Sequence, residues 1–377
     1  MAKLGEVFTI ASGGTPDKGN PFYYENGTIP WVKTGDLKNQ YVPTGIDCIT
    51  EEGLNNSPAK LFPPNTVLVA MYGATIGACS ILSYEAATNQ ACAAFLPNEN
   101  VLPTYLYYFL LSKRDQFVKD GVGGAQPNIS AGYLKNVQFD LVPVRQQEVI
   151  VERLDKIENL IALRKEQLAK LDELVKARFV ELFGDQKTNP FGWEQCTIGE
   201  CCTLKSGTSL PSEVENEGGP IPYIKVGDMN YPGNERYITT SSRYVSESTA
   251  GKGLFEVGSI LFPKRGGAIG TNKKRMTKRP VCADLNVMGV SSKGRLRPEY
   301  LLAYFDMIDL GALSDGSSVP QINNKNIAPL VICMPPLELQ EQFAAFVKQT
   351  DKSKLAVQQS HVKLELLKKA LMQKYFG

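Results

Sequence analysis

The sequence predicts a duplicated chain in which two α/β (α+β) globular domains are joined by an antiparallel two-helix coiled coil with internal pseudo-two-fold symmetry. Three observations predict this fold. Motifs recur at one offset, turn-rich stretches alternate with two heptad-patterned helices, and the composition is that of a globular protein. Hydrophobic residues make up 43% and charged residues 21%, values near the globular average that argue against wholesale disorder.

The recurrence has an offset of 193 residues, seen between Gly73 and Gly266 and again between Phe183 and Phe376. The register drifts by a residue or two near the start of each copy, as loop insertions would produce. Such a duplication predicts two similar modules that contact two related targets at once. The matched motifs are residues 4–6 with 198–200, 29–36 with 221–228, 72–77 with 265–270, and 127–129 with 320–322.

Each copy opens with a mixed, turn-rich part. Between residues 3 and 140, short apolar runs such as Thr66–Ala70 are separated by Gly, Pro and Asn clusters, which is typical of strands and loops. We expect a helix at Pro103–Val118, because proline suits the first helical turn. The second copy repeats the pattern, with a strand at Ile260–Phe262 and a helix at Pro298–Ile308.

Each copy closes with a long helix that is expected to start after a proline and stop before Gly184 or Gly377. Apolar residues seven apart predict a coiled-coil seam. Helices of about 35 to 40 residues span roughly 50–60 Å at ~1.5 Å per residue, too long to bury a stripe on one small domain, so antiparallel pairing is favoured over two separate core helices. The seam residues are Leu154, Ile157, Ile161, Leu168, Leu171 and Val175 in the first helix, and Val357, Leu364 and Leu371 in the second.

The second seam is less regular, since Lys354, His361 and Lys368 stand where the first helix has apolar residues. The boundaries that follow are a first domain at 1–142, a first helix at 143–184, a second domain at 185–335 and a second helix at 336–377.

No complete catalytic constellation is present. The single histidine, His361, lies mid-helix without a Ser, Cys or acidic partner at a telling spacing, and the eight cysteines include no CxxC pair. The segment Asn20–Tyr23 resembles the base-holding loop of amino-methyltransferases but lacks its second proline. Without a signal peptide at Met1, we expect the cysteines to be free thiols in the cytoplasm. The stretch Asn65–Tyr84 carries no charge, but its counterpart in the second copy, residues 258–277, is basic, so we expect no membrane-spanning segment. These features favour a binding protein over an enzyme.

One stretch favours DNA contact over a merely solvated charged face. Residues 264–279 hold seven basic side chains and no acid around a glycine turn, together with Asn272, whose amide can pair bidentately with adenine. The net charge of only +2 means that any basic surface must be local. The equivalent loop in the first copy, Met71–Thr75, is neutral, so the two loops would read different sequences.

The chain resembles the specificity subunit of a type I restriction–modification system over essentially its whole length. The resemblance rests on the Ile-Pro-aromatic-hydrophobic-Lys-x-Gly-Asp motif at 29–36 and 221–228, on the run at 124–130 with its counterpart at 318–323, and on the opening of each long helix. The family's Pro-Leu-x-Glu-Gln opening lacks its Glu in both copies here.

The resemblance implies two target recognition domains that each read half of a split, asymmetric double-stranded DNA site, and paired helices that act as a ruler. It implies two methyltransferase (modification) subunits carrying S-adenosylmethionine as partners, with restriction subunits using ATP and Mg²⁺ as a further partner class. This chain would be non-catalytic, cytoplasmic, part of phage defence through DNA methylation, and without a cofactor or metal of its own. The residues predicted to contact DNA are Lys33, Thr34, Tyr72, Thr75, Gln126, Asn128, Lys225, Lys264, Arg265, Asn272, Lys273, Lys274, Arg275, Gln321 and Asn323.

Three alternatives stay open on the sequence alone. One is a specificity subunit of a related phage-defence methylase system, which only neighbouring genes would separate. Another is a coiled-coil adaptor that does not bind DNA, which would leave the glycine and basic loops unexplained. The third is a self-contained nuclease–methylase, which would require motifs that this sequence lacks.

Overall fold

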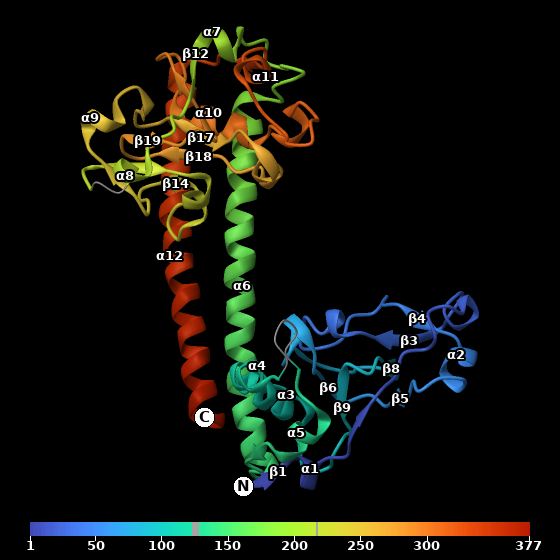
Figure 1. The fold of residues 1–377 in the computed structure, drawn as a ribbon. Helices are drawn as coiled ribbons and strands as arrows, with labels where there is room; N and C mark the ends of the chain where they lie inside the picture. Colours follow the sequence, from blue (N-terminus) through green and yellow to red (C-terminus); the bar gives the residue numbers. More distant parts are fainter. Residues whose placement is uncertain (123–127, 216–217) are drawn as a thin grey trace. The chain divides into compact units, whose positions relative to one another are not determined.

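The structure, a computed structural model, describes residues 1–377 except 123–127 and 216–217. The chain forms two compact units. Unit 1 comprises Met1–Lys165 and Gln359–Gly377, and unit 2 comprises Glu166–Gln358. Each long helix therefore contributes one segment to each unit (Figure 1). Among the described residues, no helix is long and apolar enough to cross a membrane.

Unit 1 contains two four-stranded sheets and a two-stranded pair, with strand orders β4-β3-β8-β5, β2-β9-β6-β7 and β1-β10. Only β3 and β8 pair in parallel within the four-stranded sheets. The elements are β1 (Ala2–Lys3), α1 (Leu4–Val7), β2 (Ile10–Ser12), η1 (Pro21–Tyr23), β3 (Ile29–Val32), η2 (Thr34–Asp36), β4 (Cys48–Ile49), α2 (Glu51–Asn55), β5 (Leu61–Phe62), β6 (Val67–Ala70), η3 (Gly73–Thr75), β7 (Cys79–Ile81), β8 (Ala86–Thr88), β9 (Cys92–Phe95), α3 (Pro103–Ser112), α4 (Arg114–Asp120), α5 (Ala131–Asn136), β10 (Gln138–Phe139) and α6 (Val144–Phe183).

Unit 2 repeats this arrangement. Its sheets have the orders β15-β13-β19-β16, β12-β20-β17-β18-β14 and β11-β21, and the β13–β19 pair is again parallel. The elements are β11 (Gln195–Thr197), α7 (Ile198–Cys201), β12 (Cys202–Ser206), α8 (Ser212–Glu215), β13 (Ile221–Ile224), η4 (Val226–Asn230), β14 (Tyr237–Ile238), β15 (Tyr244–Val245), α9 (Glu247–Ala250), η5 (Gly251–Gly253), β16 (Leu254–Phe255), β17 (Ile260–Pro263), η6 (Gly266–Thr271), β18 (Arg275–Thr277), β19 (Val281–Ala283), β20 (Val287–Ser292), α10 (Pro298–Asp306), η7 (Gly311–Leu313), α11 (Asn324–Ile327), β21 (Val331–Cys333) and α12 (Leu337–Phe376).

In unit 1 the core joins the domain to both long helices. α3 lies between α6 and the strands (Figure 1). Leu154 of α6 is fully buried in this core, and Phe376 of α12 packs against the rings of Tyr105 and Phe109 at centroid distances of 5.3 and 6.0 Å. Burying these large rings stabilises the helix ends on the domain, because each ring removes much apolar surface from water.

In unit 2, the C-terminal end of α6 and the N-terminal part of α12 are packed on the domain in the same way. Phe183 of α6 packs on Tyr300 of α10 and on Phe343 of α12, at 4.7 and 5.5 Å between ring centroids. Phe179, one turn earlier, stacks on the same tyrosine at 5.2 Å and is 1% exposed. Helix α6 then stops at Gly184, whose φ of 74° is the left-handed conformation typical of a helix C-terminus.

All the seam residues predicted from the heptads are buried or half-buried. Within unit 1, Leu154, Ile157 and Ile161 are buried, and Leu364 and Leu371 are half-buried. Within unit 2, Val175 is buried and the remaining ones are half-buried, namely Leu168, Leu171 and Val357.

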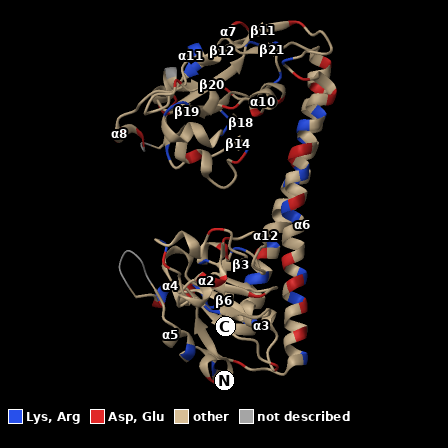
Figure 2. Cartoon of the chain, turned by 90° about the vertical axis from the view of Figure 1, so that its right-hand side faces the viewer, with Lys and Arg blue, Asp and Glu red and all other residues tan. Residues whose placement is uncertain are grey.

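The two lysines that interrupt the second seam form ion pairs with acids on the other helix. In unit 1, Lys368 pairs with Glu158 of α6. In unit 2, Lys354 pairs with Asp172 at 2.5 Å. His361 has Glu365, on its own helix, 3.9 Å away. Figure 2 shows basic and acidic positions interspersed along α6. At these two lysines, the seam therefore has ion pairs between the helices in place of apolar contacts.

The expectation of a single helix at Pro103–Val118 is wrong, because this segment forms two helices. The chain leaves α3 at Ser112 and restarts as α4 at Arg114, with Lys113 between them at φ −89° and ψ 0°. Propensity alone favours continuation, but tertiary contacts decide here: the Lys113 ammonium donates a hydrogen bond to the Phe376 carbonyl at 2.5 Å, at the C-terminal end of α12. Similarly, α10 ends at Asp306, two residues before the expected end.

Replacing Phe179 by alanine should lower the free energy of unfolding of unit 2 by about 3–5 kcal/mol, because it empties a closely packed aromatic site. The adjacent Val180, which is 48% exposed, provides the control, and its replacement by alanine should cost about 0.5 kcal/mol or less. Denaturant unfolding followed by fluorescence measures both. Equal effects of the two substitutions would contradict the assignment of Phe179 to the core.

Candidate nucleic-acid interface

In unit 2, the glycine-rich loop and a distant proline segment meet. The loop forms η6, separated from the end of β17 by two residues, and the Gly266 N–H donates to the Pro320 carbonyl at 2.8 Å. Arg265 and Gln321 face each other in an isolated antiparallel bridge. Gly266 has φ of 71°, a conformation that glycine adopts without a Cβ penalty. Two motifs that are far apart in the sequence therefore form one surface.

Unit 1 repeats this meeting at the corresponding positions. η3 follows β6, the Ile129 N–H donates to the Met71 carbonyl at 3.0 Å, and Tyr72 and Asn128 form the equivalent antiparallel bridge. Each bridging residue lies 193 positions before its counterpart in unit 2. The sequence pointed to these motifs separately, and the structure brings them together twice.

The bridging residues carry side chains suited to base contacts. Tyr72 is 44% exposed, Asn128 and Arg265 are exposed, and Gln321 is half-buried. Thr75 is half-buried, and its hydroxyl donates to the Tyr72 carbonyl at 3.0 Å. Arginine can pair with guanine and amides with adenine in the major groove. The unlike pairs in the two units would give each a different sequence preference.

The Lys-x-Gly-Asp motif builds a turn in both units. The Asp36 carboxylate accepts the backbone N–H of Lys33 at 2.8 Å, and Asp228 accepts that of Lys225 at 2.7 Å. Each acid satisfies a free N–H at the start of η2 or η4, where a carboxylate is favoured. Thr34, the first residue of η2, is half-buried in this turn. The motif's recurrence is thus explained by local structure.

The two lysines of this motif already have acidic partners. Lys33 pairs with Asp47, and this hydrogen bond raises the pKa of Lys33. Lys225 pairs with Glu215 at 2.6 Å. Both ammonium groups also lie near the aromatic residue of the motif, at 5.9 and 5.8 Å from the ring centroids. Contact with a phosphate would require these lysines to exchange partners.

The basic run does not present all its charges outward, because Lys274, one of the residues predicted to contact DNA, is buried. Lys274 is 4% exposed, and its ammonium donates to the Asn272 side-chain oxygen at 2.7 Å and to the Ile308 carbonyl at 2.6 Å. Burial lowers the pKa of Lys274 to about 8. This lysine joins the loop to the end of α10 rather than to a ligand.

Asn272 has a structural role that competes with base reading. It adopts a left-handed conformation with φ of 53° at the end of η6. Its side-chain oxygen accepts from Lys274 and from the Leu310 N–H at 2.9 Å. A bidentate contact with adenine needs that same oxygen as an acceptor. The predicted adenine contact by Asn272 is therefore disfavoured by the geometry.

Other predicted cations are partly engaged within unit 2. Burial lowers the pKa of half-buried Lys264, and its ammonium donates to the Ser206 hydroxyl at 2.9 Å. Lys273 donates to the Asn230 side chain. Arg275 is half-buried, burial lowers its pKa, and it donates to the Lys274 carbonyl at 2.9 Å.

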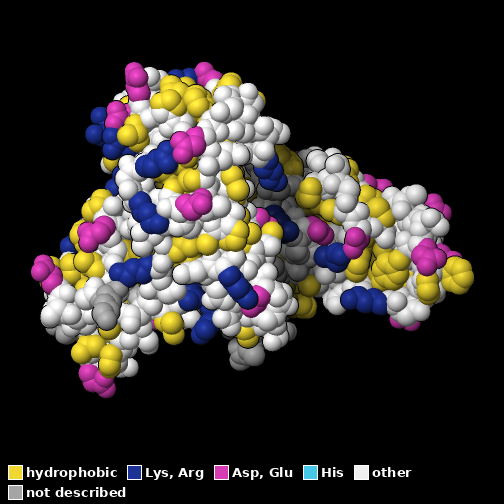
Figure 3. All heavy atoms as spheres, turned by 90° about the horizontal axis from the view of Figure 1, so that it is seen from above, with side chains coloured by type: hydrophobic (Ala, Val, Ile, Leu, Met, Phe, Trp, Pro, Cys, Tyr) yellow, Lys and Arg dark blue, Asp and Glu magenta, His cyan; other side chains and the backbone are white. Residues whose placement is uncertain are grey.

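Arg265, the residue that precedes η6, is exposed. On the face drawn in Figure 3, basic and acidic side chains are interspersed. Asn323 is half-buried and precedes α11, with its N–H donating to the Asn326 side chain at 2.9 Å. Gln126 lies outside the described residues.

Asn20, from the methyltransferase-like segment, accepts the Phe22 N–H at the start of η1, which is a capping role.

The family profile of the type I restriction modification DNA specificity domain matches residues 1–173 and 190–368. The chain belongs to this family. It matches the MjaIX specificity subunit of Methanocaldococcus jannaschii at 25% identity over 402 residues, covering 99% of this chain and 91% of that protein. It also matches the EcoR124I/EcoR124II specificity subunit of Escherichia coli at 29% identity over 181 residues, covering 47% and 45%.

Two solved structures share the fold. A structure from a study of complex assembly and conformational transition in the type I system aligns with a TM-score of 0.64 at 18% identity, covering 100% of this chain and 96% of its own. The specificity subunit of M. genitalium aligns at 0.56 and 16% identity, covering 100% and 95%. The protein is a type I restriction–modification specificity subunit. The predictions of a duplicated fold and of a non-catalytic subunit, whose partners perform catalysis, are confirmed by this membership.

The buried ammonium of Lys274 gives a pH dependence with a defined sign. Its folded-state pKa of about 8 lies below the unfolded value of 10.5, so between these values the unfolded chain binds more protons and stability rises with pH. The free energy of unfolding of the wild type relative to Lys274→Met should therefore increase from pH 8 to about pH 10. Denaturation across this pH series measures the difference, and a constant difference would contradict the burial.

Proposed function

We propose that this subunit reads a bipartite, asymmetric double-stranded DNA site, with one half-site contacted by each domain, and positions adenine methyltransferase partners there. The observation that carries the proposal is the repeated bridge between a glycine loop and a proline segment, which places Tyr72 with Asn128 in unit 1 and Arg265 with Gln321 in unit 2. The same backbone frame with unlike side chains suits two different readouts. Family membership supports the same function.

The long helices would fix the gap between the half-sites. α6 and α12 each contain 40 residues, and each belongs partly to unit 1 and partly to unit 2. Each domain is attached to the helices by buried rings such as Phe376 and Phe183. A helix changes length in steps of ~1.5 Å per residue, so a helical spacer specifies a distance.

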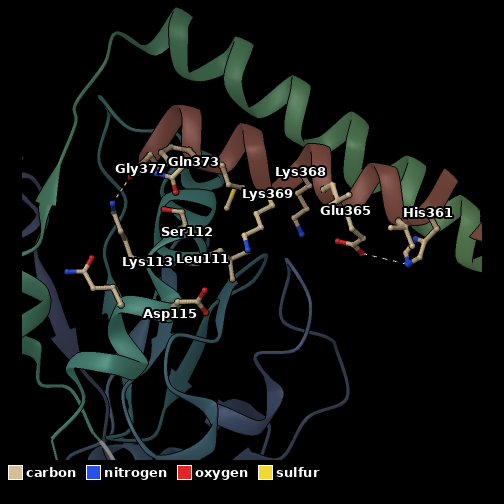
Figure 4. Close-up of a pocket in the computed structure, with 15 residues that line it drawn as sticks. Leu111, Ser112, Lys113, Asp115, His361, Glu365, Lys368, Lys369, Gln373 and Gly377 are labelled. Atoms are coloured by element: carbon tan, nitrogen blue, oxygen red, sulfur yellow. Dashed lines mark hydrogen bonds and ion pairs between the residues drawn. The ribbon is translucent and has the colours of Figure 1, made fainter. Parts of the chain in front are cut away.

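The methyltransferase partners would dock on exposed apolar surface of the helices. A groove of about 840 Å³ lies in unit 1 between α12 and the α3–α4 turn, lined by apolar Leu366 and Met372 and by the ammonium-bearing Lys368 and Lys369 (Figure 4). Leu366 is 63% exposed. S-adenosylmethionine, and ATP with Mg²⁺ where restriction subunits join, would be held by these partners in the cytoplasm.

DNA binding by the assembled complex tests the role of Arg265. Replacing Arg265 by alanine should cost about 1–3 kcal/mol on the cognate DNA and relax the preference at one position of one half-site, if the guanidinium reads a base edge. If it holds a phosphate instead, affinity falls for all sequences and the slope of log affinity against log salt becomes shallower by about one.

The control for this experiment is Lys187→Ala, which removes an exposed cation from the segment after α6. Fluorescence anisotropy across a salt series, with cognate and scrambled duplexes, supplies the measurement. Unchanged affinity, slope and preference for Arg265→Ala would remove this loop from the interface. Absence of DNA binding by the wild-type complex would favour the coiled-coil adaptor instead.

Lengthening both helices tests the ruler. A heptad inserted after Lys165 in α6 and another after Gln358 in α12 keeps the seam in phase. The insertions add about 10 Å at ~1.5 Å per residue, or about three base pairs at ~3.4 Å each. Mapping of methylated adenines should show unchanged half-sites with a longer gap. Altered half-site bases with the original gap would contradict the ruler.

A further inference from the structure

The first turn of each long helix contains a glutamine that is completely buried. Gln147 and Gln340 both have 0% exposure and lie at corresponding positions, 193 residues apart. Buried glutamine is uncommon, because an amide leaves water at a cost unless its hydrogen bonds are replaced. The neighbouring Gln146 is exposed. Burial of one glutamine, and not of its neighbour, indicates a specific internal role.

In unit 1, the Gln147 side chain joins three segments. Its amide nitrogen donates to the Val142 carbonyl, just before α6, and to the Asn100 carbonyl, both at 2.8 Å. Its oxygen accepts the N–H of Leu102, the residue that precedes α3, at 2.9 Å. One side chain thus ties the base of the long helix to the loop that starts the domain's main helix.

In unit 2, Gln340 makes the same three contacts. Its nitrogen donates to the Pro335 carbonyl at 2.8 Å and to the Arg295 carbonyl at 3.2 Å. Its oxygen accepts the N–H of Arg297, the residue that precedes α10, at 2.8 Å. The loop before α10 is shifted by two residues relative to the first copy, yet the equivalent atoms are bound. The arrangement is therefore preserved across an insertion.

These contacts constrain direction in a way that apolar packing does not. Hydrophobic contact is non-directional, so the aromatic clusters hold a helix against its domain without specifying one angle. Hydrogen bonds have preferred lengths and angles, and three of them converge here on one planar amide. A small tilt of the long helix at its base would break at least one of them.

We propose that Gln147 and Gln340 are positioning residues that fix the direction in which each long helix leaves its domain, and so restrict the DNA gap to one length. This inference rests on the proposed function, because it states that two buried amides determine how accurately the helical spacer sets the gap. Neither residue contacts DNA in this scheme. Their effect is on spacing, and half-site sequence is unaffected.

The test uses the complete subunit assembled with its methyltransferase partners. Gln147→Met and Gln340→Met retain an unbranched side chain of similar volume and remove every hydrogen bond. Gln146→Met and Gln342→Met, at exposed positions on the same helices, are the matched controls. Each complex methylates a DNA library in which the two half-sites are separated by gaps of different length, and methylated adenines are sequenced.

The wild type and both controls should methylate one gap length. Each buried-glutamine variant should raise methylation at gaps one base pair shorter or longer by about tenfold relative to the preferred gap, equivalent to about 1.4 kcal/mol of lost discrimination. Half-site bases should be unchanged. Faster hydrogen exchange in a peptide containing Leu102, with protection elsewhere retained, should accompany Gln147→Met.

A folded Gln147→Met or Gln340→Met complex that keeps the wild-type gap preference overturns the inference while leaving the proposed function intact. Failure of the wild-type complex to methylate any bipartite site overturns both. If a methionine variant does not fold, Gln147→Asn and Gln340→Asn, which keep the amide but withdraw it by one methylene, replace it. An unchanged gap preference in those variants also overturns the inference.

Discussion

The structure depends on the burial of aromatic side chains at the ends of two long helices. Phe376 of α12 packs on the first domain, and Phe183 of α6, its counterpart one repeat earlier, packs on the second. Each helix begins on the domain of its own repeat, where a buried glutamine is bound, and ends on that of the other. Hydrophobic burial supplies the stabilisation, and the amide contacts supply direction.

The duplication and the helices were accessible from the sequence because they depend on local and periodic signals. Apolar residues seven positions apart, such as Leu154, Ile161 and Leu168, directly indicate a coiled-coil seam. The break at Lys113 was not accessible, since a hydrogen bond to the distant Phe376 carbonyl is a tertiary contact. The meeting of the glycine loop with the proline segment likewise joins residues more than 50 positions apart.

The charges of the basic run show how composition can mislead. Lys274 and Arg265 are equally cationic in the sequence, but one is buried against the Ile308 carbonyl and the other is exposed. The local pattern gives no sign of this difference, because it depends on where α10 ends. Gln147 and Gln340 carried an available signal, since they recur at the repeat offset in the first turn of each long helix, but their burial depends on the loops before α3 and α10.

The most direct measurement is genome-wide mapping of methylated adenines in a methylation-free host that expresses this subunit with its methyltransferase partner. The two domains share the same backbone bridge but expose different side chains, Tyr72 in one and Arg265 in the other. The account therefore predicts a single asymmetric motif, made of two different half-sites with a constant unread gap between them. A contiguous motif, or two identical half-sites, would contradict the account.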